Sequence, residues 1–510
     1  MKGAILVCGT HSDAGKSVLA AGICRWLARQ GVRVAPFKAQ NMSLNSVVTL
    51  DGGEIGRAQA AQAAAAGLEP EVAMNPILIK PSGERHSQVI VMGRPYADAD
   101  ARSYGAMKHE LRPVVAAALA DLRARYDVVV CEGAGSPAEI NLRSNDLTNM
   151  WLAREAGLAT LVVADIDRGG VFASLFGTLA LLSPEDQAHV AAFVINKFRG
   201  DLGILAPGLD DLRTRTGRPT LGVLPFVEDL WMDVEDSLAL DASTPETPAA
   251  GGDTLDVAVL RLRWISNFTD ADALGAEPGV RVRFTRSAAD VERADLVVIP
   301  GTKATVEDLE RLRAVGLDRA LAARAAKGDP ILGICGGYQI LGESIADTVE
   351  SRRGAVAGLG LLPVRTRFEA DKILRRRTGR SPWLQTDASG YEIRHGRVER
   401  HGGEELIEGE GCVAGAVIGT AWHGVLEHDG FRRALLARVA SLRRRCFMPG
   451  TTPFAAVRAA RLDALGELVA NHLDTARLTE LIDGGVGWSD RILPTIETEV
   501  RGLAALRHDG

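Results

Sequence analysis

Residues 9–17 read Gly9-Thr10-His11-Ser12-Asp13-Ala14-Gly15-Lys16-Ser17 and follow an apolar run, Gly3–Val7, that predicts a buried strand. A glycine-rich loop between a strand and a helix lets backbone N–H groups face an anion at the helix N-terminus. Lys16 would reach the β- and γ-phosphates of a nucleotide, and the Ser17 hydroxyl would bind Mg²⁺. The spacing from Gly9 to Gly15 is one residue longer than in the usual phosphate loop, but strand, loop and helix follow in the required order. We therefore predict a phosphate-binding loop that contacts ATP through Gly9, Thr10, Asp13, Ala14, Gly15, Lys16 and Ser17.

Short apolar runs alternate with helical segments on both sides of a break in this pattern. Up to about residue 240 the alternation predicts a parallel sheet covered by helices, which is an α/β domain. Residues 241–254 are rich in Pro, Gly, Ser and Thr, which is typical of an interdomain linker. A second α/β rhythm occupies residues 255–440. Residues 441–510 have a helical pattern, and we expect them to form a tail packed on the second domain.

Composition excludes several classes of protein. The chain has 510 residues, a net charge of -6 and 46% hydrophobic residues, which suits a multidomain globular protein and not a globally basic nucleic-acid binder. Its six cysteines contain no close-spaced pair, so neither a metal knuckle nor a disulfide framework is indicated. The apolar stretches are too short for a signal-peptide core or a membrane span, and we expect a cytoplasmic protein.

Polar residues follow several predicted strands of the first half. Glu132 ends the apolar run 128–131, and the carboxyl ends of parallel strands are where such sheets bind ligands. We therefore expect Glu132 to help Ser17 hold Mg²⁺. Asp165 and Asp167 are further candidates for metal binding or for positioning Lys16. Asn196 follows the next strand and is a candidate for contact with the purine of ATP.

The segment 36–46 is unusually dense in amides and follows the second predicted strand. Lys38, Gln40 and Asn41 are the candidates there for binding a polar, carboxylate-rich substrate. Ordinary turn chemistry is the alternative explanation for these residue types.

In the second half, Cys335 has the surroundings of a catalytic nucleophile. Gly333, Cys335 and Gly337 reproduce the pattern glycine, any residue, nucleophile, any residue, glycine at a strand-to-helix turn. Small neighbours allow this sharp turn, and a helix N-terminus favours a thiolate. We predict that Cys335 is a nucleophile.

The general base should be a histidine that is distant in sequence and near in space. His423 directly follows an apolar strand and is preferred over His395, which is the rival candidate. An oxyanion needs two backbone N–H donors. Gly336 should supply one, because it follows the nucleophile, and Gly301 at another strand end should supply the other.

These motifs together resemble known families. Residues 333–337 with His423 look like the class I glutamine amidotransferase domain, which has a flavodoxin-like α/β fold. The phosphate loop, residues 132–135 and residues 196–197 look like the dethiobiotin-synthetase type of P-loop ATPase. Their fusion in this order resembles the CobB/CobQ family of cobalamin biosynthesis, and segments 36–46, 141–143, 167–170 and 390–393 look most like its cobyric acid synthase branch.

The resemblance implies an enzyme that takes ammonia from glutamine and uses ATP with Mg²⁺ to amidate a corrin substrate. It implies adenosylcobyrinic acid a,c-diamide as that substrate and its b, d, e and g carboxylates as the sites of reaction. The chain departs from the class I pattern at Val425, where a glutamate is usual. Glu427 could replace that glutamate, or Cys335 and His423 could act as a dyad. The alternatives are a cobyrinic acid a,c-diamide synthase and a non-catalytic P-loop ATPase with a relic glutaminase domain.

Overall fold

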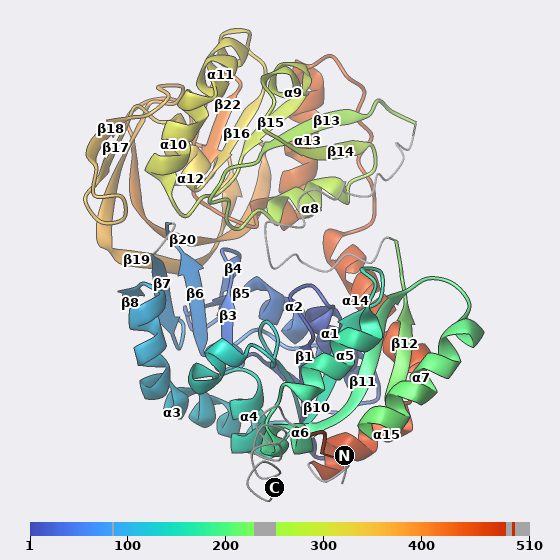
Figure 1. The fold of residues 1–510 in the computed structure, drawn as a ribbon. Helices are drawn as coiled ribbons and strands as arrows, with labels where there is room; N and C mark the ends of the chain where they lie inside the picture. The colour runs from blue at the N-terminus through green and yellow to red at the C-terminus, as the bar shows by residue number, and fades with distance from the viewer. Residues whose placement is uncertain (84–85, 229–250, 486–491, 495–510) are drawn as a thin grey trace, which may run out of the picture.

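The computed structural model describes residues 1–83, 86–228, 251–485 and 492–494. The chain forms two α/β domains, drawn one above the other in Figure 1. Most of the predicted linker, residues 241–250, lies outside the described residues. Within the described part of the chain, no helix has the length and apolar character needed to cross a bilayer.

The first domain is organised around a six-stranded parallel sheet. Its strand order is β12-β11-β10-β1-β9-β2, so β1 lies in the middle. The central strands are continuous apolar runs because helices cover both faces of the sheet. The strands are β1 (Gly3–Gly9), β2 (Val34–Phe37), β9 (Val128–Glu132), β10 (Ala159–Asp165), β11 (Val190–Phe198) and β12 (Thr220–Pro225).

Side chains of β1 alternate between two hydrophobic cores. Leu6 faces one core and Val7 the other, as the twofold repeat of a strand requires. The Leu6 side is covered by α3 (Ala101–Arg125), α4 (Met150–Ala156), α5 (Val171–Ala180), α6 (Pro184–His189) and α7 (Leu202–Thr216). The Val7 side is covered by α1 (Lys16–Arg29), with α2 (Arg57–Ala65) packed beside it.

The helices of the tail pack mainly on this first domain, not on the second as expected, although Phe454 at the start of the first tail helix is buried in the second domain's core. Helices α14 (Phe454–His472) and α15 (Thr475–Gly484) bury Leu465, Val469 and Leu481 in the same core as α1. A Cβ at Gly22 of α1 would lie 2.8 Å from the Leu465 carbonyl oxygen, so α1 and α14 are in close contact. Figure 1 shows both tail helices, in red, against the lower domain. Sequence periodicity predicts a helix but not its partner.

The second domain has its own mixed sheet, in the order β14-β13-β15-β16-β22-β21. All neighbours are parallel except β21 and β22. The strands are β13 (Leu255–Leu260), β14 (Val280–Thr285), β15 (Leu296–Ile299), β16 (Ile331–Ile334), β21 (Cys412–Ala414) and β22 (Val417–Thr420). The helices on one face are α9 (Ala288–Arg293), α10 (Thr305–Ala314), α11 (Leu317–Ala326) and α12 (Gly336–Leu341), and those on the other are α8 (Asp270–Gly275) and α13 (Asp429–Leu442).

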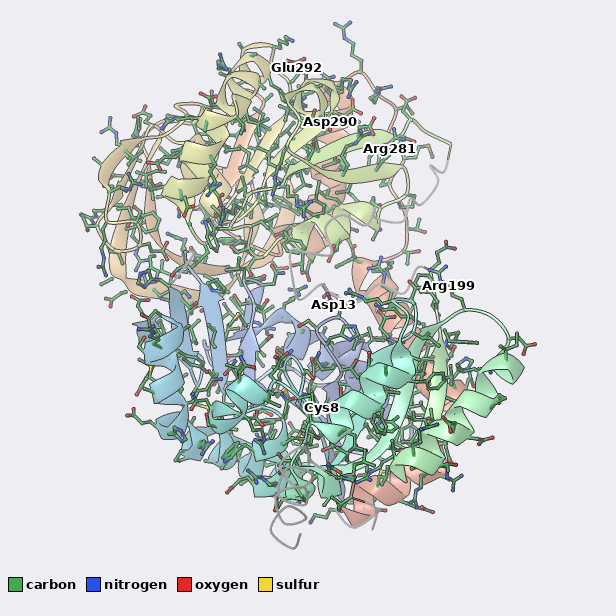
Figure 2. All side chains as sticks on the ribbon, viewed as in Figure 1. Cys8, Asp13, Arg199, Arg281, Asp290 and Glu292 are labelled. Atoms are coloured by element: carbon green, nitrogen blue, oxygen red, sulfur yellow. The ribbon has the colours of Figure 1, made fainter. Side chains whose placement is uncertain are left out.

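Smaller sheets bring the two domains into contact. The first domain adds β3 (Gln40–Met42), β6 (Ile77–Pro81), β7 (Ser87–Val91) and β8 (Arg94–Ala99), with a separate pair formed by β4 (Ser46–Val48) and β5 (Glu54–Gly56). The second adds β17 (Ser344–Asp347), β18 (Gly354–Ala357), β19 (Val364–Ser381) and β20 (Thr386–Arg400). The long β19–β20 hairpin contacts β4, and a small apolar cluster forms there from Val47, Val48, Ile55, Leu374, Tyr391 and Ile393. In Figure 2, by contrast, Arg281 and Asp290 lie on the second domain away from this contact.

Candidate functional site

The phosphate loop joins β1 to α1 as the sequence predicts. Gly15 has a φ of 104°, a conformation that a residue with a side chain rarely adopts. The ammonium of Lys16 curls back over the loop and donates to the His11 carbonyl oxygen over 3.0 Å. The Asn196 amide donates to the Ala14 carbonyl oxygen over 3.1 Å. Asn196 thus stabilises the loop through its backbone, and its contact with a purine stays a prediction.

Basic side chains border the loop on the β10 and β11 side. The Lys197 ammonium lies 2.7 Å from Asp165 Oδ2 and donates to the Asp13 carbonyl oxygen over 3.2 Å. The Arg168 guanidinium lies 3.9 Å from the Asp13 carboxylate. Asp13 lies toward the upper domain in Figure 2, whereas Cys8 of β1 lies deeper in its own domain. Asp165 is engaged by cations here, which suits a positioning role better than a metal ligand.

Glu132 is fully buried and forms the centre of a polar cluster beside the loop. Its carboxylate accepts hydrogen bonds from Ser17 Oγ over 2.7 Å and from Lys38 Nζ over 2.9 Å, and the Gln62 amide donates to its second oxygen. Burial alone would raise the pKa of Glu132, but the Lys38 charge and these three hydrogen bonds hold it below its ordinary value. Glu132 is therefore ionised and lies beside Ser17, as a shared metal ligand would.

Ser17 and Glu132, beside the phosphate loop, are the residues that could bind Mg²⁺. Ser17 Oγ and Glu132 are already in contact, but no group of three or more His, Cys, Asp or Glu ligands gathers anywhere in the described residues. Mg²⁺ commonly takes one or two protein ligands and completes its shell with phosphate oxygens and water. Ser17 and Glu132 thus fit a Mg²⁺ ion that arrives bound to a nucleotide. In this structure the Lys38 ammonium supplies the positive charge that neutralises Glu132.

The predicted substrate-binding side chains are buried and hydrogen-bonded within the first domain. Gln40 accepts from the Tyr104 hydroxyl over 2.6 Å, and the Asn41 amide donates to Gln59 over 2.9 Å. Lys38, Gln40 and Asn41 are 3%, 9% and 2% exposed. In this state they hold the segment 36–46 in place, and their contact with substrate stays a prediction.

Cys335 lies at the sharp turn between β16 and α12. Its φ of 51° and ψ of -106° are strained for a residue with a side chain. A Cβ at Gly337 would lie 1.9 Å from the Ile299 carbonyl oxygen, and one at Gly333 would lie 2.8 Å from the backbone of Gly337. Glycine is required at both positions, as the nucleophile turn predicts.

We expected the helix N-terminus to stabilise a Cys335 thiolate, but in this structure burial has the larger effect on the thiol pKa. Burial raises the pKa of the Cys335 thiol to about 11, although the Arg394 charge and the Gly336 backbone lower it. A neutral thiol is the resting form at neutral pH. The nucleophile therefore needs a base that removes its proton during the reaction.

His423 is placed near Cys335 by strand pairing. Ile334 of β16 pairs with Thr420 of β22, and the two strands run parallel, so the residues that follow them emerge at the same edge of the sheet. The His423 imidazole is 1% exposed and stacks on Tyr391 with ring centroids 5.6 Å apart. Burial, with the nearby Lys80 charge, lowers the pKa of His423 to about 3. A neutral imidazole is the form that can accept the thiol proton.

The rival histidine, His395, lies on β20 and lines the same pocket as Cys335. One ring nitrogen, Nδ1, is within 3.0 Å of the Glu369 carbonyl oxygen. His395 thus lines the pocket around Cys335, whereas His423 is not among the residues that line it and follows the strand paired with that of Cys335. The strand pairing favours His423, and the choice between them stays a prediction.

Gly336 belongs to the nucleophile turn, and Gly301 lies beside His423 and Ser266. A Cβ at Gly336 would lie 3.0 Å from the backbone nitrogen of Thr302, and one at Gly301 would lie 2.5 Å from His423 Cε1. Thr302 lines the Cys335 pocket. The two predicted donor residues therefore border the same site, and their role in binding an oxyanion stays a prediction.

Glu427 does not orient His423, which corrects one of the two alternatives drawn from the sequence. Its carboxylate lies 2.6 Å from Arg57 Nη2 of the first domain and 3.1 Å from Arg458 Nη1 of the tail. Neither ring nitrogen of His423 has a hydrogen-bond partner of normal geometry among the described residues. Glu427 is instead an ion-pairing residue between parts of the chain.

Asp270 is a residue near the site that sequence reasoning missed. Its buried carboxylate accepts hydrogen bonds from the Gly424 N–H over 2.9 Å and from the Leu426 N–H over 3.0 Å. Burial raises the pKa of Asp270 to about 7, although these two hydrogen bonds lower it. Asp270 fixes the turn that directly follows His423. No motif in the sequence marks Asp270, which lies far along the chain from His423.

The Cys335 pocket opens on the contact between the domains. Lys80 of the first domain lines it together with Asn267, Lys303, Arg394 and other residues of the second. Behind Lys80, the buried Glu54 carboxylate bridges the Lys80 and Lys372 ammonium groups at 2.7 and 2.5 Å. The pocket around Cys335 therefore includes a residue of the first domain.

Comparison with known proteins agrees with this arrangement. The model of the CobQ/CobB/MinD/ParA nucleotide binding domain matches residues 5–239, and that of the CobB/CobQ-like glutamine amidotransferase domain matches residues 256–431. The chain is 58% identical to proteins named cobyric acid synthase from Frankia casuarinae, Rhodococcus jostii and Streptomyces coelicolor, over 95% of this chain and 98%, 96% and 97% of theirs. The chain belongs to the cobyric acid synthase family.

Family membership confirms the resemblance seen in the motifs and the two-domain α/β fold class. The chain is a glutamine amidotransferase enzyme, as predicted, so the alternative of a non-catalytic P-loop ATPase with a relic glutaminase domain is wrong. A solved protein described as glutamine amidotransferase covers 36% of this chain and 97% of its own, at 20% identity and a TM-score of 0.30.

Proposed function

We propose that this member of the cobyric acid synthase family converts adenosylcobyrinic acid a,c-diamide to the corresponding hexa-amide acid by amidating its b, d, e and g carboxylates. Glutamine supplies the nitrogen and ATP the driving force. The observation that supports this most strongly is one chain holding both a phosphate loop backed by Glu132 and a Cys335 turn paired with the His423 strand. The family name supports the corrin substrate.

In the glutaminase half-reaction, Cys335 Sγ attacks the side-chain carbonyl carbon of glutamine while His423 accepts the thiol proton. The proton then passes to the leaving nitrogen, which departs as ammonia and leaves a thioester on Cys335. Water attacks the thioester carbon, and glutamate leaves as Cys335 regains its proton. The Gly301 and Gly336 N–H groups would stabilise the oxyanion in both steps.

In the ligase half-reaction, a substrate carboxylate must gain a leaving group before ammonia can displace its oxygen. The carboxylate oxygen attacks the γ-phosphorus of ATP, ADP leaves, and an acyl phosphate forms. Lys16 would neutralise charge on the transferring phosphoryl group. Ammonia then attacks the acyl carbon and phosphate leaves, which gives the amide.

Ser17 and Glu132 would hold Mg²⁺ when a nucleotide is bound, and the ion would supply charge neutralisation at the phosphates. The Lys38 ammonium would then give up its contact with Glu132. The resting Lys38–Glu132 pair, at 2.9 Å, keeps the buried carboxylate ionised until that exchange.

The proposed substrate is tested by incubating the protein with ATP, glutamine and either adenosylcobyrinic acid a,c-diamide or cobyrinic acid. Mass spectrometry then counts the replacements of OH by NH₂. We expect amidation of the a,c-diamide at the b, d, e and g positions. Amidation of cobyrinic acid at positions a and c only would instead identify the earlier amidase of the same family.

A further inference from the structure

Asn267 lies in a strained conformation in the middle of the contact between the domains. Its φ is 50°, in the left-handed region that asparagine tolerates better than most residues. The residue is 3% exposed and lines the pocket that contains Cys335. A buried, strained residue beside a nucleophile persists only when its surroundings hold it there.

The groups that hold Asn267 come from the other domain. The Asn267 backbone N–H donates to Asn45 Oδ1 over 2.8 Å, and Asn267 Oδ1 accepts from the Ser46 backbone N–H over 2.7 Å. This reciprocal pair joins the second domain to the end of segment 36–46. The same segment carries Lys38, which contacts Glu132 beside the phosphate loop.

On its other side Asn267 faces the proposed base. A Cβ placed on Gly301 would approach both His423 Cε1, at 2.5 Å, and the Ser266 carbonyl oxygen, at 2.7 Å, so the Ser266–Asn267 backbone borders the imidazole. The Asn267 backbone raises the pKa of His423 against the effect of burial and of Lys80. The backbone at Asn267 thus lies beside His423, whose ring nitrogens have no hydrogen-bond partner among the described residues.

Tyr391 supports the opposite side of the base and is held by the same segment. Its ring stacks on the His423 imidazole, and its backbone exchanges two hydrogen bonds of 2.9 Å with that of His423. The Tyr391 hydroxyl donates to the Ser46 carbonyl oxygen over 3.2 Å. Ser46 thus contacts both residues that flank His423.

We propose that Asn267 is a positioning residue for His423, and that Asn45 and Ser46 of the nucleotide-binding domain hold Asn267 and Tyr391 in place. This inference rests on the proposed glutaminase roles of Cys335 and His423. The Ser266–Asn267 backbone on one side and the Tyr391 ring on the other fix the position of the imidazole by packing. The glutaminase site is consequently complete only when the nucleotide-binding domain is docked in this arrangement.

The test compares variants of the full-length protein that remove these contacts with one that removes an unrelated contact between the domains. Asn45→Ala deletes the acceptor of the Asn267 N–H. Asn267→Gly keeps the left-handed backbone accessible but deletes the Ser46 acceptor. Arg376→Ala is the matched control, because Arg376 donates to the Val48 carbonyl oxygen and pairs with Glu69 across the same contact without touching Asn267.

Glutamate release from glutamine is measured for each variant, together with the midpoint of thermal unfolding. We expect Asn45→Ala and Asn267→Gly to lower the glutaminase kcat about tenfold, with a smaller change in KM, because the base and not the binding pocket is displaced. Arg376→Ala should leave both unchanged.

Wild-type kcat in Asn45→Ala and Asn267→Gly would overturn the proposal. So would an equal fall of kcat in Arg376→Ala, or a loss that appears in KM and not in kcat. Ammonium-dependent amidation, which bypasses the glutaminase site, should persist in all three variants. Absence of glutaminase activity in the unaltered protein would overturn both this proposal and the proposed function, whereas absence of corrin amidation alone would overturn only the latter.

Discussion

The Cys335 backbone N–H donates to the Thr420 carbonyl oxygen over 2.7 Å, so the nucleophile turn is attached to the strand that ends just before His423. Because β16 and β22 are parallel neighbours, this bond sets the nucleophile and the proposed base at one edge of one sheet. The chemistry proposed for the site depends on that relationship and on the neutral resting forms of both side chains.

The first prediction concerns the pH dependence of Cys335 reactivity. The pKa of the thiol is raised to about 11 and that of His423 is lowered to about 3, both by burial, so both groups are neutral between these values. Alkylation of Cys335 by iodoacetamide, measured by peptide mass spectrometry, should therefore rise steadily from pH 7 toward pH 10. A rate that is already maximal at pH 6 would indicate a thiolate–imidazolium pair and would contradict this description.

The second prediction concerns the buried pair of Glu132 and Lys38. Glu132→Gln leaves the Lys38 ammonium buried without its counter-charge, which costs about 3–5 kcal/mol when a buried pair is broken. The variant should unfold at lower denaturant concentration and lose ATP-dependent amidation while it keeps glutaminase activity. Adding Lys38→Met should restore much of the stability but not the amidation. Equal stability of the Glu132→Gln protein and the unaltered protein would show that the pair is not buried as described.

The third prediction separates two carboxylates near His423. Asp270→Ala leaves the Gly424 and Leu426 N–H groups without their acceptor, at a cost of about 1–3 kcal/mol each when such groups stay buried. The glutaminase kcat should fall, and Asp270→Asn, which retains one acceptor oxygen, should fall less. Glu427→Gln should have little effect on glutamine hydrolysis, because Glu427 pairs with Arg57 and Arg458 and not with the imidazole. A larger loss in Glu427→Gln than in Asp270→Ala would reverse these assignments.

The fourth prediction concerns the tail. Leu465 is 1% exposed in the core shared with α1, and Leu→Ala substitutions in such cores cost about 2–5 kcal/mol. Leu465→Ala should lower the unfolding midpoint and weaken nucleotide binding, measured by calorimetry. Glu467→Ala on the exposed side of the same helix, where Glu467 lies 3.5 Å from Arg29, should change neither measurably. Loss of stability with unchanged nucleotide binding would show that the tail does not support the phosphate-loop domain.

Local sequence patterns were enough to predict much of the fold and of the candidate site. The phosphate loop and the Cys335 turn were predictable because each requires particular small residues beside a strand, and the structure confirms both turns at Gly15 and Cys335. Glu132 was expected beside Ser17 because strand ends of a parallel sheet share an edge, and the two side chains are in contact.

Contacts between distant segments were not predictable in this way. A helical period shows that α14 has an apolar face but not which core receives it, so the main contact of the tail helices with the first domain was not predicted. Glu427 is close to His423 in sequence, yet Arg57, far away in the chain, competes for its carboxylate. Asn267 and Asp270 carry no motif, and their importance comes from hydrogen bonds to backbone groups that only the tertiary structure brings near.

The most direct test of the two-site account is the nitrogen source used by Cys335→Ala. The variant and the unaltered protein are given ATP and adenosylcobyrinic acid a,c-diamide with either glutamine or ammonium, and the products are identified by mass spectrometry. We predict that Cys335→Ala forms the amides with ammonium but not with glutamine, while the unaltered protein uses both. Glutamine-dependent amidation by Cys335→Ala would contradict the account, as would failure of the unaltered protein to amidate the corrin with either source.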